Sequence, residues 1–309
     1  MKGLSRLALC TDVAAFAVVL MGSWTRINDA GLTCPDWPMC RGELVPSMAG
    51  GTIWEWTHRL LAFSLLPLIL AVFFSAWRHR KRSGLLLPIA SAILILFFTQ
   101  VGLGAATVDL DNTPYSVVLH WGTAMMLIAS LLALAIFANE DLRRDAEGFR
   151  TDERLQGITS QVLLLSLTVL VTFVTMCIGA WVSSSGAGLA CTTIPGCAGN
   201  VLVDTQGQIV QMLHRFAAAA TLLGATASCA LVWARRTSAP VRVATSVGVV
   251  LVFVQVILGL LNVALRLPTD LREVHAANAA LVFLAFVTAT AFALLESPLP
   301  RSLSSRGSS

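Results

Sequence analysis

The sequence predicts an all-α polytopic membrane protein, with eight transmembrane helices arranged as two tandem four-helix bundles. Its composition, eight long apolar runs and an internal repeat support this fold class. Of the 309 residues, 56% are hydrophobic and 12% are charged, whereas soluble domains have about 45–50% and about 25%. This composition argues against a soluble enzyme and against a disordered chain. The net charge of +4 is too small to indicate a nucleic-acid partner.

Eight apolar runs are long enough to cross a bilayer as helices, which takes about 20 mostly apolar residues each. The runs are continuous rather than alternating, and this argues against membrane-spanning strands. We expect the spans at residues 7–26, 58–77, 85–108, 115–138, 158–182, 210–234, 243–265 and 274–295.

The charged loops predict the orientation, because loops rich in Lys and Arg stay in the cytoplasm. Of the 21 Lys and Arg residues, 15 lie on the side that holds both termini. We therefore expect a multi-pass protein with both termini in the cytoplasm. The first apolar run ends in Trp24-Thr25-Arg26 rather than in a small-residue cleavage site, so we expect no cleaved signal peptide.

The two halves of the chain repeat one another at an offset that drifts only from 157 to 155 residues. An offset that is nearly constant over a whole half indicates a duplication. Matching segments are Gly22-Ser23-Trp24 with Gly179-Ala180-Trp181, His58-Arg59 with His214-Arg215, and His120 with His275.

Each half contains four expected spans, so the first helix of each half starts on the same side and the repeat is parallel. The loop between the halves is highly charged and is the natural linker. We expect an N-terminal bundle at 1–140, a cytoplasmic linker at 141–157, a C-terminal bundle at 158–296 and a cytoplasmic tail at 297–309.

Four of the five histidines, His58, His120, His214 and His275, fall near the outward-facing starts of even-numbered spans. Ionisable groups within a membrane are costly and are therefore candidates for function. A helix-end imidazole anchored at the interface is the simpler interpretation for one histidine, but it explains four in register less well. His79 lies in the basic cytoplasmic turn, and we expect it to be a solvated loop residue.

Two imidazoles from facing helices suit axial ligation of a heme iron, which pairs His58 with His120 and His214 with His275. Zinc is the competing metal. It usually takes three or four ligands, with Cys or carboxylate nearby. Each half offers two histidines, which favours heme.

The two halves differ three residues before the first histidine of each pair. Glu55 precedes His58, whereas Gln211 precedes His214. Residues three apart share a helix face, so only the N-terminal pair has a carboxylate beside it. This difference favours one reactive and one supporting site. A hydrated carboxylate at the span boundary is the alternative interpretation.

An arginine directly follows the first histidine of each pair, as Arg59 and Arg215. Arginine pairs well with carboxylates, so both are candidates for binding heme propionates. A side chain that reaches back to the membrane interface is the other interpretation.

Each half also has a Cys-x5-Cys loop on the outer side, where disulfides persist. We expect disulfides Cys34–Cys40 and Cys191–Cys197, either as structural clips or, for the first pair above all, as redox-active groups. The other three cysteines fall in spans and are most simply small core residues: Cys10, Cys177 and Cys229.

In combination, these motifs resemble the bacterial heme A synthase family. The resemblance runs from about residue 7 to 295, without departure at the motif positions. Some members lack a Cys pair, and this chain keeps both. The motifs are Gly22-x-x-Thr25-Arg26, Gly31-Leu32-Thr33-Cys34-Pro35-Asp36-Trp37-Pro38-Met39-Cys40, Glu55-x-x-His58-Arg59, Gln100-x-x-Leu103-Gly104, Leu119-His120, Gln211-x-x-His214-Arg215, Gln255-x-x-Leu258-Gly259 and Glu273-Val274-His275.

The resemblance implies an oxidoreductase of a bacterial cell membrane that converts the C8 methyl of heme O to a formyl group, through a hydroxylated intermediate, for terminal oxidases. It implies that His58 and His120 hold the substrate heme O. It implies that His214 and His275 ligate heme b, and that Glu55 is the catalytic carboxylate. Membrane lipid surrounds the chain, and a heme O synthase and a second copy of the chain are candidate partners.

Iron held between two imidazoles has no position for oxygen, so we favour electron removal from the ring, with Glu55 accepting a proton and water supplying oxygen. A non-catalytic bis-histidine di-heme electron-transfer protein is the main alternative, but it leaves Glu55 and the first Cys loop unexplained. A transporter would need charges at mid-membrane depth. Asp12 is the only acid well inside an expected span.

Overall fold

The computed structural model describes residues 2–81, 83–139, 142, 158–193, 195–197, 203 and 205–297. Within this part of the chain there are eight α-helices, all long and apolar enough to cross a membrane, and no strand beyond one isolated bridge. The protein is therefore an all-α multi-pass membrane protein, as predicted. The helices are α1 (Lys2–Ile27), α2 (Thr52–Arg78), α3 (Leu86–Asp109), α4 (Pro114–Phe137), α6 (Ile158–Ser184), α7 (Gln206–Ala234), α8 (Ala239–Ala264) and α9 (Thr269–Glu296), with a 3-10 turn η2 (Ala187–Leu189).

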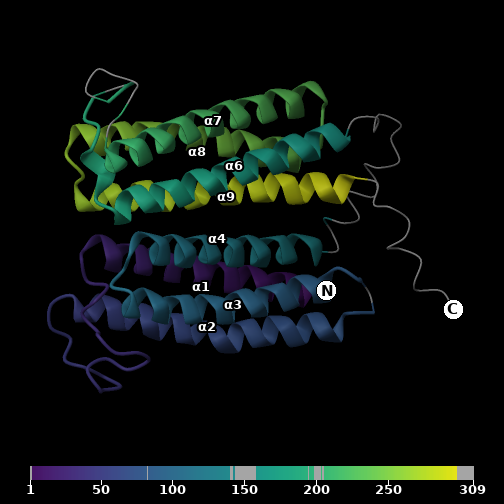
Figure 1. The fold of residues 1–309 in the computed structure, drawn as a ribbon. Coiled ribbons are helices and arrows are strands. Elements are labelled where there is room, and N and C mark those ends of the chain that lie inside the picture. Colours follow the sequence, from purple (N-terminus) through teal and green to yellow (C-terminus); the bar gives the residue numbers. More distant parts are fainter. Residues whose placement is uncertain are drawn as a thin grey trace.

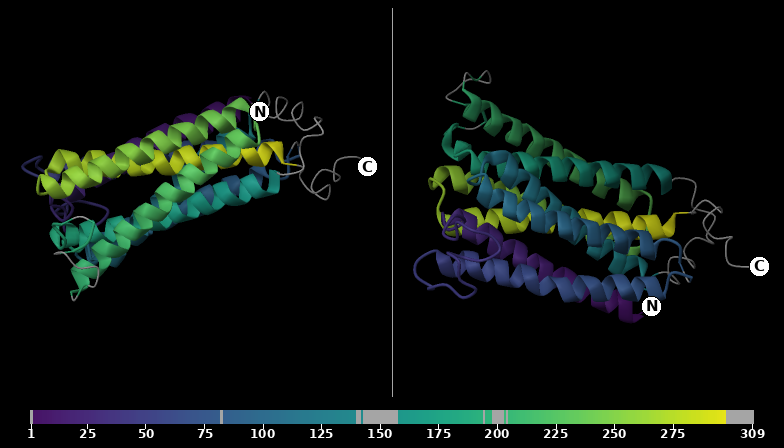
Figure 2. Two further views of the ribbon diagram at one scale, coloured as in Figure 1. Left: turned by 90° about the horizontal axis from the view of Figure 1, so that it is seen from above. Right: turned by 60° about the horizontal axis from the view of Figure 1, so that its bottom comes forward.

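The helices gather in two groups, α1–α4 and α6–α9, which lie side by side (Figure 1). Helix α4 packs against α6 and α9, and α1 packs against α9, so these four helices form the seam between the groups. The other views show all helices running lengthwise, with the loops at the two ends (Figure 2). The expected linker, apart from Leu142, and the tail beyond Ser297 lie outside the described residues. The domain boundaries and the duplication remain predictions.

Helices α4 and α9 bury more of their residues than the other helices do, because they lie at the seam. Close approach there depends on small residues. A Cβ added at Gly122 of α4 would lie 3.4 Å from the Cys177 sulfur and 3.4 Å from the Phe173 ring, both on α6. Small residues let membrane helices approach closely, where van der Waals packing replaces the hydrophobic effect. Outward-facing positions are apolar, as lipid contact requires, for example Leu170 and Phe253.

Hydroxyl groups link α6 to α7 in the second group. The Thr168 and Ser228 hydroxyls lie 2.9 Å apart, as do those of Thr175 and Thr221. At the corresponding places between α1 and α2, the sequence has Thr11 with Val72 and Val18 with Leu65. The two groups therefore hold their first helix pair together by different interactions.

Several helices begin earlier than the apolar runs predicted. Helix α2 starts at Thr52 rather than residue 58, and α7 starts at Gln206 rather than 210. These first turns contain polar residues, such as Glu55 in α2 and Gln208 in α7, which the hydropathy pattern leaves outside an apolar run. At α7, Thr205 and Gln208 form a reciprocal capping box. As a consequence, His58, His214 and His275 lie about two turns inside their helices rather than at the ends, as His120 does in α4.

Two minor predictions need correction. His79 is the C-cap residue of α2 and is half-buried, with its Nδ1 2.7 Å from the Ser75 carbonyl oxygen, so it closes the helix end rather than lying free in a loop. Cys10 is exposed on the outer face of α1, whereas Cys177 and Cys229 are partly buried. In a membrane protein the outer face is as apolar as the core, so composition could not separate the two positions.

Candidate ligand site and the disulfide loops

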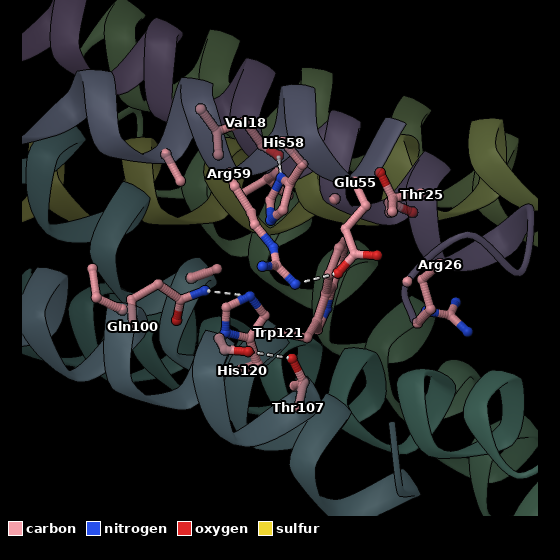
Figure 3. A pocket seen from close by; sticks show the side chains of 18 of the residues that line it. Val18, Thr25, Arg26, Glu55, His58, Arg59, Gln100, Thr107, His120 and Trp121 are labelled. Atoms are coloured by element: carbon pink, nitrogen blue, oxygen red, sulfur yellow. Dashed lines mark hydrogen bonds and ion pairs between the residues drawn. The ribbon is translucent and has the colours of Figure 1, made fainter. Parts of the chain in front are cut away.

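A cavity of about 190 Å³ lies among α1–α4, near the end that carries the disulfide loop. The lining includes Glu55, His58, Arg59 and His120, and Figure 3 shows these side chains entering from α2 and α4. The structure therefore brings together the four residues that the sequence singled out in the N-terminal half. Ligand sites usually measure about 300–1,000 Å³, so a large ring requires side chains such as Gln100 to move.

The His58 imidazole has a defined orientation. Its Nδ1 donates to the Val18 carbonyl oxygen at 3.1 Å, which leaves Nε2 as the acceptor nitrogen. The ring lies against Gly22, where an added Cβ would be 2.6 Å from Cε1. A backbone carbonyl on one ring nitrogen is the usual support for an imidazole that binds metal through the other.

His214 has the same surroundings in the second helix group. Its Nδ1 lies 3.2 Å from the Thr175 carbonyl oxygen, and a Cβ at Gly179 would be 2.9 Å from Cε1. Because Val18 and Thr175, like Gly22 and Gly179, are 157 residues apart, equivalent positions perform equivalent tasks in the two halves.

His120 and His275 form a second matched pair. Each ring lies against a glycine, Gly104 or Gly259, whose added Cβ would lie 3.2 or 3.3 Å from Cε1. Each Nε2 faces a glutamine amide nitrogen, of Gln100 at 3.2 Å and of Gln255 at 3.1 Å, and each Nδ1 is buried without a partner. A buried ring nitrogen without a partner costs about 1–3 kcal/mol, so this arrangement indicates rings that are completed by a ligand.

The histidines of each half are close enough to interact electrostatically, His58 with His120 and His214 with His275. Paired imidazoles with an available nitrogen fit the axial positions of a heme iron. Within the described residues, no group of three or more His, Cys, Asp and Glu side chains is placed to hold a metal ion by itself. Two imidazole donors in each half fit iron that arrives within a porphyrin ring.

Glu55 connects the N-terminal cavity to the first disulfide loop. Its Oε2 accepts hydrogen bonds from the Cys34 backbone N–H at 2.8 Å and from the Thr33 hydroxyl at 2.9 Å. Its Oε1 accepts from Arg59 at 2.5 Å, and the side chain is only 5% exposed. Three donors thus hold a buried carboxylate in one orientation at the cavity wall.

Gln211 occupies the same place in the second half. Its Oε1 accepts from the Cys191 backbone N–H at 2.5 Å, and its Nε2 donates to the Gly188 carbonyl oxygen at 2.8 Å. The position that corresponds to Thr33 is Ala190, which has no hydroxyl. Glu55 and Gln211 therefore accept the same backbone hydrogen bond in their halves and differ in charge.

Arg59 has a role that the sequence analysis missed. Its guanidinium donates to three carbonyl oxygens of the disulfide loop, those of Asp36 at 2.5 Å, Met39 at 2.7 Å and Cys34 at 2.8 Å, in addition to Glu55. Arg59 is therefore a clamp that holds the loop over the N-terminus of α2. Its pairing with heme propionates remains a prediction.

Arg215 clamps the second loop in the same way. It donates to the carbonyl oxygens of Cys191 at 2.7 Å, Thr193 at 2.7 Å, Gly196 at 2.9 Å and Pro195 at 3.2 Å. In the sequence, each half has one Cys-x5-Cys loop and one His-Arg pair. This association is the signal that could have predicted an arginine clamp, but the sequence analysis treated the loop and the arginine separately.

Both expected disulfides are present, with sulfur–sulfur distances of 1.99 Å for Cys34–Cys40 and 2.13 Å for Cys191–Cys197. The half-cystines are fully buried beneath their loops. The backbone N–H groups of Cys34 and Cys191 donate hydrogen bonds to Glu55 and Gln211. Each disulfide therefore lies next to the side chain that is a carboxylate in one half and an amide in the other.

Asp36 organises the first loop from outside the membrane spans. Its carboxylate accepts from the backbone N–H of Gly42 at 2.7 Å and from that of Arg41. The Gly42 N–H is the main cause that lowers the pKa of Asp36 below its ordinary value of 3.8. A lowered pKa means that the ionised form stabilises the folded loop above about pH 4, and that this stabilisation is lost as the pH falls through the folded-state pKa.

Asp36→Asn should therefore loosen the first loop at neutral pH. We expect faster amide hydrogen exchange in a peptide covering residues 34–43, and in the wild type we expect a similar increase only below about pH 4. The peptide around Cys191 provides the internal control, because Asp36 does not contact it. Equal protection of the first loop in the variant and the wild type at pH 7 would contradict this assignment.

Eight membrane helices with a pair of half-buried imidazoles in each half define the class: a multi-pass membrane protein with two candidate bis-imidazole sites. Within that class, the chain belongs to the COX15-CtaA family, whose members are described as cytochrome oxidase assembly proteins. The family's sequence profile matches residues 5–51 and 47–287.

Individual relatives are named heme A synthase. The chain is 31% identical to the heme A synthase of Shewanella oneidensis, over 91% of this chain and 94% of the relative. It is also 31% identical to that of Bacillus licheniformis, over 76% of each chain. The heme A synthase of Shouchella clausii is 29% identical over 76% of this chain and 77% of its own length.

Proposed function

We propose that this protein is a heme A synthase, an oxidoreductase that converts the C8 methyl of heme O to a formyl group through a hydroxylated intermediate. The observation that carries the proposal is a buried carboxylate, Glu55, at the wall of a cavity that also contains two facing imidazoles. The names of the relatives support the same activity. The position equivalent to Glu55 in the second half is an amide, which favours one reactive site.

The residues divide into two sets. His58 and His120 would hold the iron of heme O in the N-terminal cavity. His214 and His275 would hold a heme b, which can accept and pass on electrons when it is bound. The fit rests on the four glycine contacts and on the ring nitrogens that have no hydrogen-bond partner. We propose that the loops face the outside and both termini the cytoplasm, so both sites lie near the outer end.

Glu55 is the group placed to accept a proton. Conversion of a methyl to a hydroxymethyl group by water releases two protons and two electrons, and oxidation to the formyl group releases two more of each. The donors from Arg59, Thr33 and Cys34 hold this side chain in one orientation at the cavity wall, and a positioned carboxylate can act as a general base. The surrounding apolar side chains limit the entry of bulk water. An electron acceptor outside the chain completes the reaction.

The direct test is heme extraction from a host that makes heme O but no heme A, with and without this chain, followed by chromatography and mass spectrometry. Heme A or its hydroxylated precursor should appear only with the chain. Unchanged heme O, together with heme b in the purified protein, would overturn the proposal in favour of a di-heme electron-transfer protein. Co-purification would test a heme O synthase or a second copy as partner.

A further inference from the structure

Arg26 joins the N-terminal cavity to the other half of the molecule. It belongs to the last turn of α1 and lines the cavity. Its Nη2 donates to the Ser183 hydroxyl on α6 at 2.8 Å. The two residues are 157 positions apart, which is the repeat offset, so equivalent positions of the two halves meet here. Arg26 therefore lies at the seam, at the end of the helices that carries the disulfide loops.

The cavity is lined by two arginines, and they are used differently. Arg59 donates to three loop carbonyls and to Glu55. The guanidinium of Arg26, by contrast, makes one hydrogen bond within the described residues, to Ser183. A guanidinium has five N–H donors, so Arg26 is the lining cation with donors to spare.

The charge of Arg26 also lacks a close partner. Asp29, Arg272 and Glu273 act on it electrostatically, but no carboxylate of the described residues lies within ion-pair distance of it. Glu273 interacts with Ser23, and its Oε2 is buried without a hydrogen-bond partner. A half-buried cation without a contacting anion is costly, and an incoming carboxylate would remove that cost.

We propose that Arg26 binds a carboxylate of the ligand in the N-terminal cavity; this rests on the proposed function, in which the ligand is heme O and the carboxylate is a ring propionate. Figure 3 shows the order along the cavity, from Gln100 past the two imidazoles to Glu55 and then to Arg26. A ring centred between the imidazoles, with its propionates toward Arg26, would have its apolar edge deep in the membrane. Its charged edge would lie at the solvent-exposed end of the helices, beside the disulfide loops.

This orientation also has a chemical consequence. In heme O the reacting C8 methyl is the ring neighbour of a propionate. Holding that propionate at Arg26 would place the methyl on the side of the ring where Glu55 lies. Arg26 is therefore a binding residue that positions the methyl for Glu55, whereas the sequence analysis named only Arg59 and Arg215 as candidates for binding propionates.

The test compares binding of heme O with binding of its dimethyl ester, by absorbance titration of protein purified from a host that makes no heme O. The His58→Ala variant measures the background, which is the absorbance change caused by heme binding in the second half of the protein. Hydrogen bonds to charged groups are worth enough to make the diacid bind roughly 10- to 100-fold more tightly than the ester to the wild type. Arg26→Gln should bind both forms with the affinity that the wild type has for the ester.

Ser183→Ala is the matched control, because it removes the observed hydrogen bond of Arg26 but keeps the charge, and it should retain the preference for the diacid. Arg26→Lys should retain part of it. Equal affinity of the wild type for the diacid and the ester would overturn the proposal, even if Arg26→Gln does not fold. Unchanged preference in Arg26→Gln would overturn it as well.

The two proposals fail separately in this experiment. If the wild type prefers the diacid through Arg26 but converts no heme O, the activity is wrong and the binding site stands. If the wild type converts heme O but Arg26→Gln keeps the preference, the activity stands and Arg26 does not bind the carboxylate.

Discussion

Glu55→Gln is expected to lower the conversion of heme O at least about 100-fold, which is the lower end of what general-base catalysis contributes. The reason is specific to this structure. Gln211 shows that an amide at this place still accepts the hydrogen bond of a half-cystine N–H, so the variant should keep its loop and lose only the proton acceptor. Arg59 would keep its three carbonyl acceptors. The measurement is the heme A and hydroxylated heme formed per mole of protein.

The control for this variant is the opposite exchange in the other half. Gln211→Glu should neither create a second reactive site nor reduce conversion by more than a few fold. Heme content and thermal stability, measured on both proteins, separate loss of chemistry from loss of structure. Conversion by Glu55→Gln within about twofold of the wild type would exclude the carboxylate as the proton acceptor.

Gly22→Ala is expected to abolish ligand binding in the N-terminal cavity. The new methyl carbon would lie 2.6 Å from Cε1 of His58 and 3.1 Å from each ring nitrogen, so the imidazole must leave its place and its hydrogen bond to Val18. Overpacking of this kind usually costs about 1–3 kcal/mol, which a protein of this size can tolerate. We therefore expect a folded protein that binds no heme O in the first half and forms no heme A.

Two matched variants make this result interpretable. Gly179→Ala should displace His214 in the same way, since its Cβ would lie 2.9 Å from Cε1, and should remove the heme of the second half instead. Gly102→Ala adds a methyl group to α3 with nothing within 4 Å, and it should behave as the wild type. Heme O binding by Gly22→Ala at wild-type affinity would show that His58 does not hold the substrate.

Much of the fold followed from local features of the sequence. Eight spans can be counted because the bilayer requires about 20 apolar residues in each, and this is a property of each segment alone. His58, His120, His214 and His275 were found because their spacing is almost the same in the two halves of the sequence. The asymmetry of Glu55 and Gln211 was equally visible, since residues three apart share a helix face.

Other features depended on segments that are distant along the chain. The arginine clamps, the hydrogen bond from Cys34 to Glu55 and the contact of Gly22 with His58 each join residues 19 or more positions apart. Hydrophobic periodicity in the sequence does not indicate which carbonyl groups of a loop accept hydrogen bonds from a guanidinium. For that reason the sequence analysis could name Arg59 as a candidate for the propionates but could not foresee that its guanidinium donates to the carbonyl groups of the disulfide loop.

The sequence by itself thus determined the class of fold, the number of spans and the identity of the paired imidazoles, because these depend on composition and on spacing within a helix. The nitrogen of each imidazole that is free of a backbone partner, the first residue of each helix and the arginine with unused donors became known only from the folded chain. These properties depend on how loops fold back over helix ends, where backbone N–H and carbonyl groups must find partners, and several distant segments compete to provide them.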